Sequence, residues 1–121
     1  SYSNLKMFDF QKLDVYQKAK VFHLECRQLI LDKKPDSFIR DQLLRASFSI
    51  SLNIAEGSAK FSKPDRKNYF TTARGSVFEC VAVFDLLHDL NTISKVELDS
   101  LMLKADELSR MLYTMIKNLA S

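Results

Sequence analysis

The sequence has few of the residues that reverse a chain, with only two Gly and two Pro among its 121 residues. Sandwiches and barrels need a turn after every short strand, and Gly and Pro supply many of those turns. Their scarcity excludes such folds, while the 46% apolar and 27% charged residues exclude a disordered chain. We therefore expect one all-α domain over residues 1–121, built from a few long helices around one core.

Long apolar runs and a cysteine framework are also missing. Consecutive apolar residues come in short runs such as Val81–Phe84, whereas a membrane span needs about 20, so we expect no membrane association. Residues 1–9 lack the apolar stretch of a signal peptide. Cys26 and Cys80 each fall on an apolar helical stripe, which favours buried, reduced thiols over a disulfide or a metal site. Together these features predict a cytoplasmic protein.

The patterns of common enzymes and metal sites are absent as well. There is no Gly-rich phosphate loop and no spacing typical of a nucleophile with its base. A di-iron bundle needs Glu from two helices and Glu-x-x-His from each of the other two. Only the stretch from Asp85 to His88 comes close, with Asp in place of Glu, and Lys20 stands three residues before His23. We expect no enzyme, no metal and no cofactor.

Three breaks divide the chain into four helical segments. They lie around Pro35, between Gly57 and Pro64, and between Asn91 and Ser94. Ser62 and Ser94 each stand three residues before an acidic residue, which predicts that both cap a helix. We expect helices over residues 12–33, 37–59, 63–91 and 95–119. Rods of similar length joined by short connections pack as an antiparallel up-down-up-down four-helix bundle.

Each segment carries apolar residues at the three- and four-residue steps of a helix, and flanking positions add more. Leu24, Phe48 and Leu86 are examples of this surplus on the first three segments. A monomeric bundle leaves the outer face of each helix to water. The surplus therefore predicts a second buried face and a homo-oligomer. Scattered surface apolar residues are the alternative, since these are common on proteins.

The net charge of +3 is unevenly placed. Residues 1–75 carry 14 Lys and Arg against 8 Asp and Glu, whereas residues 76–121 carry 4 against 7. A dense basic stretch is typical of a nucleic-acid-binding surface, and also of the solvated surface of a turn. The candidate phosphate contacts are Lys60, Lys63, Arg66, Lys67, Arg74 and Arg45.

Polar residues also occupy positions where the core should lie. Asn53 and Glu56 stand near the end of the second segment, and Ser76 and Glu79 near the start of the third. These two regions face each other in an antiparallel pair, so we expect one network that joins all four side chains. The network is either a lock between helices or subunits, or a binding site. Nearby small residues, Gly57 and Gly75 among them, favour close helix approach, with Gly75 pointing to an interface.

Three blocks of the sequence resemble a known family. They are Phe10–Ala19, the stretch from Gln42 to Gly57 that ends in Asn-Ile-Ala-Glu-Gly, and Phe70–Glu79. The family comprises four-helix-bundle proteins encoded within intervening sequences of bacterial 23S ribosomal RNA genes, often labelled S23-type ribosomal proteins. The chain departs from the family pattern at Tyr16, where Trp is usual, and at Ser47, where Ala is usual.

The resemblance implies a bundle that assembles as a ring-like homopentamer and has no catalytic activity. The family is similar to the accessory variability determinant of diversity-generating retroelements, a pentameric barrel that binds nucleic acid and a reverse transcriptase. We therefore expect a non-enzymatic homo-oligomer that binds RNA or DNA through a basic surface. The alternative is a scaffold for a partner protein, with no nucleic-acid role.

Overall fold

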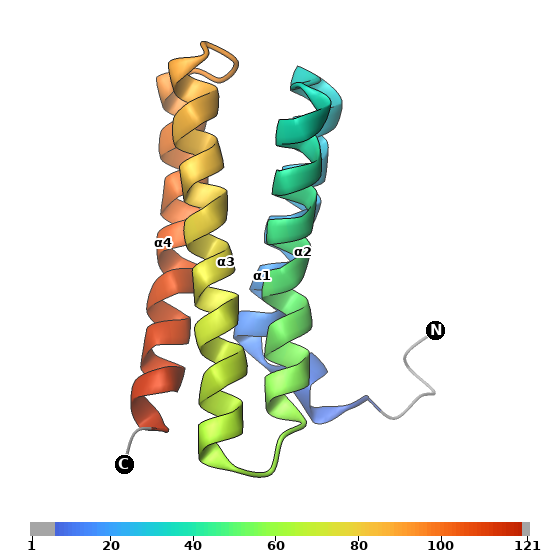
Figure 1. The fold of residues 1–121 in the computed structure, drawn as a ribbon, viewed down its shortest axis with the longest axis vertical. Coiled ribbons are helices and arrows are strands. Elements are labelled where there is room, and N and C mark those ends of the chain that lie inside the picture. The colour runs from blue at the N-terminus through green and yellow to red at the C-terminus, as the bar shows by residue number, and fades with distance from the viewer. Residues whose placement is uncertain (1–6, 120–121) are drawn as a thin grey trace.

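The computed structural model describes residues 7–119, and within them the chain forms helices and no strand. The four long helices are α1 (Asp14–Lys33), α2 (Ser37–Ser58), α3 (Lys63–Asp89) and α4 (Lys95–Asn118), and a short 3-10 helix, η2 (Asp9–Lys12), precedes them (Figure 1). The expected all-α class with four helices is confirmed. Helix α1 begins two residues later than expected because residues 9–12 form the separate 3-10 turn.

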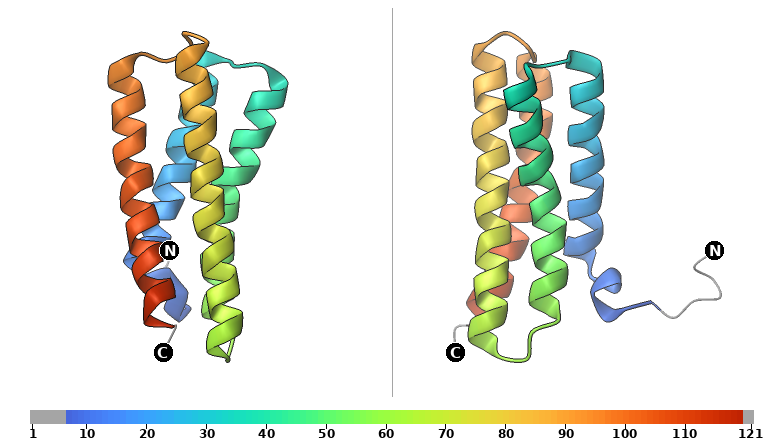
Figure 2. Two further views of the ribbon diagram at one scale, coloured as in Figure 1. Left: turned by 60° about the vertical axis from the view of Figure 1, so that its left-hand side comes forward. Right: turned by 45° about the vertical axis from the view of Figure 1, so that its right-hand side comes forward.

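The helices stand side by side as a bundle, and each connection turns the chain back along the helix before it (Figures 1 and 2). The α1–α2 and α3–α4 connections lie at one end, and the α2–α3 connection lies at the other. Helix α1 packs against α2 and α4, and α3 packs against α2 and α4. The short η2 lies against α1 and α2, so it covers the bundle close to the α2–α3 connection.

The two helix caps expected from the sequence are confirmed. Ser62 Oγ accepts a hydrogen bond from the backbone N–H of Asp65 at 3.2 Å. Ser94 Oγ accepts one from the N–H of Glu97 at 3.1 Å, and the carboxylate of Glu97 accepts one from the N–H of Ser94 at 2.9 Å. These contacts satisfy amide groups that a helix start leaves without partners. They determine where α3 and α4 begin.

The core contains the two cysteines, and both are free and fully buried as expected. Cys26 lies on α1 and Cys80 on α3, two diagonal helices with no pair of Cα atoms within 8 Å. A disulfide needs Cα atoms about 4.4–6.8 Å apart. A hydrogen bond with the Cys26 thiol raises the pKa of Cys80, and burial raises it further. The pair therefore packs as two thiols.

The two glycines differ in the space around them. Gly57 lies inside α2, within the helix expected over residues 37–59, and a Cβ there would stand 2.8 Å from Cε1 of Phe70 and 2.9 Å from Cβ of Tyr69. Gly75 is exposed on α3, and a Cβ there would meet nothing within 4 Å. The close approach expected at both positions is found within the protomer only at Gly57. It brings the end of α2 against the start of α3.

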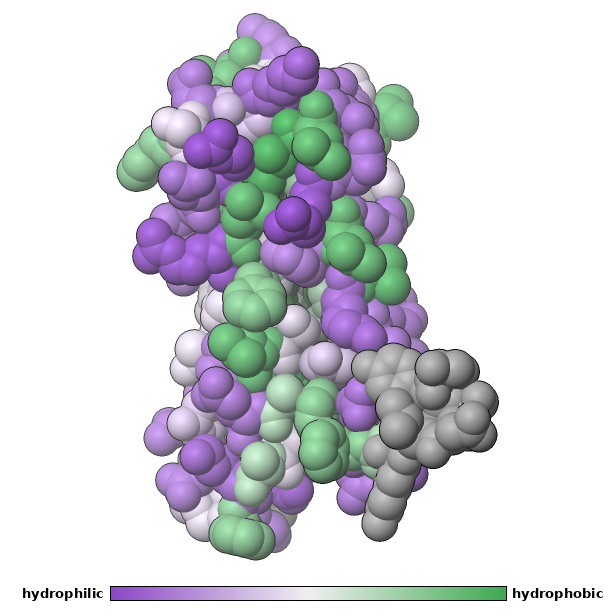
Figure 3. All heavy atoms as spheres, turned by 90° about the vertical axis from the view of Figure 1, so that its right-hand side faces the viewer, coloured by the Kyte–Doolittle hydropathy of each residue, from purple (hydrophilic) through white to green (hydrophobic). Residues whose placement is uncertain are grey.

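The outer surface of the protomer carries many large apolar side chains. Figure 3 shows apolar atoms interspersed with polar ones along the face that the right-hand side of Figure 1 presents. The expected surplus of apolar surface is therefore present, and no helix in the described range is long and apolar enough to cross a membrane. The exposed large apolar residues on the four long helices are Val21, Leu24, Leu31, Phe38, Phe48, Leu52, Phe78, Leu86, Val96, Leu103 and Tyr113.

Candidate functional site

Four of the six predicted phosphate contacts gather at one end of the bundle, around the α2–α3 connection. Lys60 lies in the connection, and Lys63, Arg66 and Lys67 lie in the first turns of α3. Lys63 and Lys67 are exposed, whereas Lys60 is half-buried with its Nζ 5.1 Å from the centre of the Tyr69 ring. The positive end of the α3 dipole points the same way. We call these four residues the basic end.

Arg66 differs from the three lysines because its side chain folds back against the protein. Its Nη2 donates to the carbonyl of Ser58 over a long 3.4 Å, and its Nε is buried with no hydrogen-bond partner among the described residues. Within residues 7–119, no carboxylate lies within ion-pair distance of the guanidinium. Arg66 is therefore a half-buried cation whose charge is not neutralised.

A cavity of about 520 Å³ opens beside this guanidinium. Residues before α1 form one wall, the last turns of α2 form the other, and Arg66 reaches it from α3. The lining is mostly apolar, which is typical of sites that bind small organic groups. We call this cavity the Arg66 pocket, and its lining residues are Phe8, Asp9, Phe10, Leu13, Ala55, Ser58, Ala59 and Arg66.

The other two predicted cations lie elsewhere. Arg74 is half-buried and turned towards α4, where its Nε donates to the carbonyl of Ser109 at 3.2 Å. Its guanidinium also lies 4.9 Å from the ring centre of Phe78 and 5.6 Å from that of Tyr113. Arg45 is exposed on α2 and lines a groove between α1 and α2. The six cations therefore do not form a single surface, and Arg74 serves to hold α3 against α4.

The predicted polar network is only partly assembled. Ser76 is buried, and its Oγ lies 2.9 Å from the Oγ of Ser49. Asn53 Nδ2 donates to the same Oγ at 2.9 Å and to the carbonyl of Ser49 at 2.8 Å. Ser49, which was not among the candidates, therefore links Asn53 on α2 with Ser76 on α3. No titratable group takes part in this contact, which joins two helices.

The two glutamates expected in that network lie outside it. Glu79 is exposed and accepts a hydrogen bond from Nε2 of Gln42 at 3.0 Å, which forms a separate bridge between α2 and α3. Glu56 is exposed and makes no side-chain hydrogen bond or ion pair with any described residue. The expectation of one network of four side chains is therefore wrong, because the rotation of the helices directs both carboxylates outward.

His23 makes a contact that the sequence did not indicate. Its Nδ1 lies 2.7 Å from the Oγ of Ser47, a fully buried side chain, and its ring tilts against Phe48 at 5.7 Å between centres. Burial lowers the pKa of His23, and the positive charge of Arg27 lowers it further. Within residues 7–119 no three His, Cys, Asp or Glu side chains are placed to hold a metal ion.

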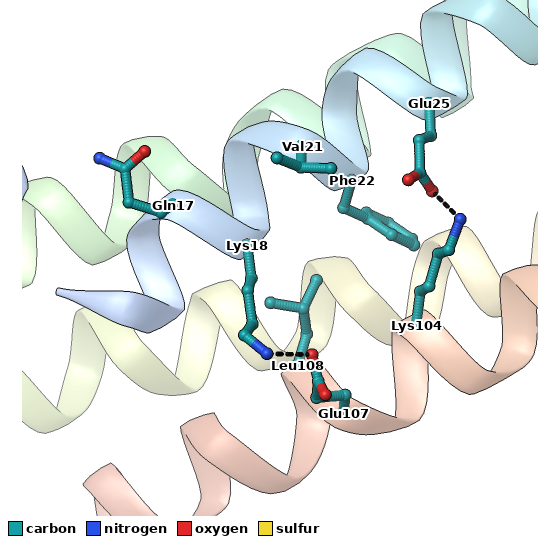
Figure 4. Close-up of a pocket in the computed structure, with 8 residues that line it drawn as sticks. All are labelled: Gln17, Lys18, Val21, Phe22, Glu25, Lys104, Glu107 and Leu108. Atoms are coloured by element: carbon teal, nitrogen blue, oxygen red, sulfur yellow. Dashed lines mark hydrogen bonds and ion pairs between the residues drawn. The ribbon is translucent and has the colours of Figure 1, made fainter.

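A second cavity, of about 300 Å³, lies between α1 and α4 (Figure 4). Two ion pairs cross it, from Lys18 Nζ to Glu107 Oε1 at 2.8 Å and from Lys104 Nζ to Glu25 Oε2 at 2.6 Å. The hydrogen bond to Glu107 raises the pKa of Lys18. Each charge is paired across the two helices, so this α1–α4 seam is a packing contact with no charge left for a ligand.

Comparison with solved structures supports the fold. A crystal structure of a protein with unknown function from the S23 ribosomal protein family of Bacteroides thetaiotaomicron VPI-5482 superposes with a TM-score of 0.79. The two sequences are 23% identical, and the match covers 85% of this chain and 98% of the other. At this identity the likeness establishes the shared fold.

Sequence comparison identifies the family. No curated protein matches the chain. The model of the 23S rRNA-intervening sequence protein family matches residues 11–114, a range that includes nearly all of the four long helices. The chain therefore belongs to the 23S rRNA-intervening sequence protein family.

Proposed function

We propose that this chain is a non-enzymatic, homopentameric, antiparallel four-helix bundle that binds RNA or DNA through its basic end. The observation that carries the proposal is the gathering of Lys60, Lys63, Arg66 and Lys67 around the start of α3. Lysine ammonium groups bind phosphates as point charges, and an arginine fork binds them through paired N–H groups. Asp65 is the one acidic residue within this stretch, so the local charge stays strongly positive.

Such contacts are directed at the nucleic-acid backbone. The chain has no motif that places a helix into a groove to read base edges, so its binding should tolerate many sequences. Self-association raises the affinity above that of one protomer, because the basic ends of several copies bind one strand together. The exposed apolar side chains of the outer helix faces, such as Phe38, Phe48 and Leu24, favour such assembly.

The test is the salt dependence of binding. Each phosphate neutralised on duplex DNA contributes about −0.9 to the slope of log affinity against log salt. The three lysines alone, without Arg66, give a slope of about −2.7, so affinity falls at least about 40-fold between about 50 and 200 mM salt for each bound protomer. Fluorescence anisotropy with labelled RNA and DNA measures this slope. Absence of binding at the lower salt, or binding without a slope, would contradict the proposal.

A matched pair of variants assigns the binding to the basic end. Replacing Lys60, Lys63 and Lys67 together by Ala should flatten the slope. The control replaces Lys34, Arg40 and Lys95, three exposed cations at the opposite end of the bundle, and removes the same charge. If both triple variants lose the same affinity, the net charge and not the basic end is responsible.

Light scattering tests the assembly. A pentamer has five times the 14.0 kDa mass of the chain. A monomeric mass at micromolar concentration would refute self-association. A mass equal to another multiple of the protomer mass would replace five by a different number of subunits.

The exposed aromatic side chains favour one other function, a scaffold for a partner protein. Phe38 and Phe61 are almost entirely exposed. In this case a neighbouring gene product would co-purify without nucleic acid. Co-purified nucleic acid that resists washing at high salt would exclude this alternative.

A further inference from the structure

We infer that the Arg66 pocket holds one nucleotide of a single-stranded nucleic acid, with its phosphate on Arg66 and its base against the apolar wall. The inference rests on the proposed function and deepens it, because it names single strands as the preferred ligand. Three features of the pocket support it: an unpaired guanidinium, an apolar wall with an exposed aromatic ring, and a row of neighbouring lysines.

The unpaired guanidinium supplies the affinity for an anion. The Arg66 guanidinium has five N–H donors, and its one hydrogen bond to a described residue is the 3.4 Å contact with the carbonyl of Ser58. That distance exceeds the usual range of about 2.7–3.2 Å, so capping the end of α2 uses little of the donor capacity. A half-buried charge without a partner is costly, and a bound phosphate would remove this cost by accepting from the free Nη groups.

The apolar wall suits a flat base. Phe8 is 72% exposed although it lines the pocket, and its ring lies nearly parallel to that of Phe10, at 18° and 6.1 Å between ring centres. On the opposite side, Ala55 and Ala59 present only methyl groups. An exposed aromatic ring beside a surface of small side chains leaves room for a stacked base. Stacking on one aromatic ring contributes about 5- to 150-fold in affinity.

The surroundings distinguish a nucleic-acid strand from a small anion. Lys60, Lys63 and Lys67 belong to the same end of the bundle as Arg66, so further cations are available there for the phosphates of neighbouring nucleotides. A carboxylate or a free phosphate would use Arg66 alone. In a duplex the bases are paired and stacked, so placing one base in the pocket requires free energy to unpair and unstack it. A single strand has no base pair to break. The pocket therefore favours single strands over duplexes.

The experiment compares the two forms of one sequence. Labelled single-stranded RNA and DNA of about 15 nucleotides, and the duplex of the same sequence, are titrated with the full-length protein at fixed salt. Phe8→Ala and Arg66→Met should each weaken single-strand binding about tenfold and change duplex binding less than about twofold. Phe61→Ala is the matched control, because Phe61 is fully exposed at the same end and does not line the pocket. Lys67→Ala should weaken both forms alike.

The outcomes separate this inference from the proposed function. If the wild type binds both forms equally, or if Phe8→Ala weakens duplex binding as much as single-strand binding, the inference is wrong and the proposed function stands. If neither form binds at low salt, both are wrong. Phe8→Leu, which keeps an apolar side chain and removes the ring, replaces Phe8→Ala if thermal unfolding shows that the alanine variant is unstable, and it should lose the single-strand preference.

Discussion

The two glycines allow a sharp test of the packing between α2 and α3. Changing Gly to Ala inside a helix normally stabilises it by about 1 kcal/mol, because Gly loses more backbone freedom on folding. Gly75 lies mid-helix with open space around the position of a Cβ, so Gly75→Ala should gain this amount in full. For 121 residues the entropy of unfolding is about 250 cal/mol/K, which makes the gain about 4 °C in Tm.

Gly57→Ala should have the opposite sign. The new methyl group would stand 2.9 Å from Tyr69 Cβ, an atom fixed to the backbone, and 2.8 Å from the ring of buried Phe70. Relieving such overlap requires the end of α2 and the start of α3 to move apart, and overpacking of this kind costs about 1–3 kcal/mol. After the gain of about 1 kcal/mol in helix propensity is subtracted, the net loss is about 0–2 kcal/mol, or up to about 8 °C in Tm.

Circular dichroism at one protomer concentration measures the difference, because self-association makes Tm depend on concentration. Ala82→Gly measures the effect of helix propensity alone, because Ala82 is exposed on α3. This change from Ala to Gly should lower Tm by about 4 °C. If Gly57→Ala is as stable as Gly75→Ala, the close contact does not constrain the bundle and the reasoning is refuted. A lower Tm for Gly75→Ala with a loss of oligomer mass would place a partner subunit against Gly75.

Three further changes test the cap, the histidine and the thiols. Ser94→Ala removes the capping box and should destabilise the protein by about 1 kcal/mol, which lowers Tm by about 4 °C. Ser100→Ala, on an exposed turn of the same helix, should leave Tm unchanged. Equal Tm values for the two variants would show that the cap does not stabilise α4. Burial, and then the positive charge of Arg27, hold the pKa of His23 below 6.5 in the folded protein. The unfolded chain therefore binds the proton more readily than the folded one. The free energy of unfolding is consequently highest above pH 6.5 and falls as the pH drops below it. His23→Gln should shrink the fall in Tm between about pH 7 and pH 5.5, and an unchanged fall would exclude this role. Both cysteines should resist a thiol reagent in the native protein and react in denaturant, and reaction in the native state would show that the core opens.

Local chemistry made much of the fold predictable from the sequence. The caps at Ser62 and Ser94 use contacts three residues apart, so the pattern alone indicates where α3 and α4 begin. The apolar periodicity likewise indicates which residues form the core. Gly57 lies within the helix expected over residues 37–59, and its close approach to α3 was also expected. The sequence does not show that Gly75 lacks such a contact within the protomer, because this depends on which face of α3 meets its neighbours.

The candidate site was less predictable because its properties depend on contacts distant in sequence. Arg66 and Lys67 are neighbours, yet one is half-buried and the other exposed, since the η2 segment and the end of α2 form a pocket around Arg66 alone. Glu79 and Ser76 lie on one helix three residues apart, and only Ser76 faces the core. Predicting this requires the rotation of each helix about its axis, which apolar stripes with surplus positions leave ambiguous.

The α1–α4 seam has a consequence for the order in which the bundle folds. Every other contact between long helices joins elements adjacent in the chain, whereas Lys18 and Glu107 belong to its first and last helices. Contacts between neighbouring helices close only short loops, so we expect the α1–α2, α2–α3 and α3–α4 contacts to form before the α1–α4 contact. Interactions formed after the rate-limiting step slow unfolding and leave the folding rate unchanged. We therefore expect the α1–α4 seam to slow unfolding of the bundle and to have little effect on its folding rate.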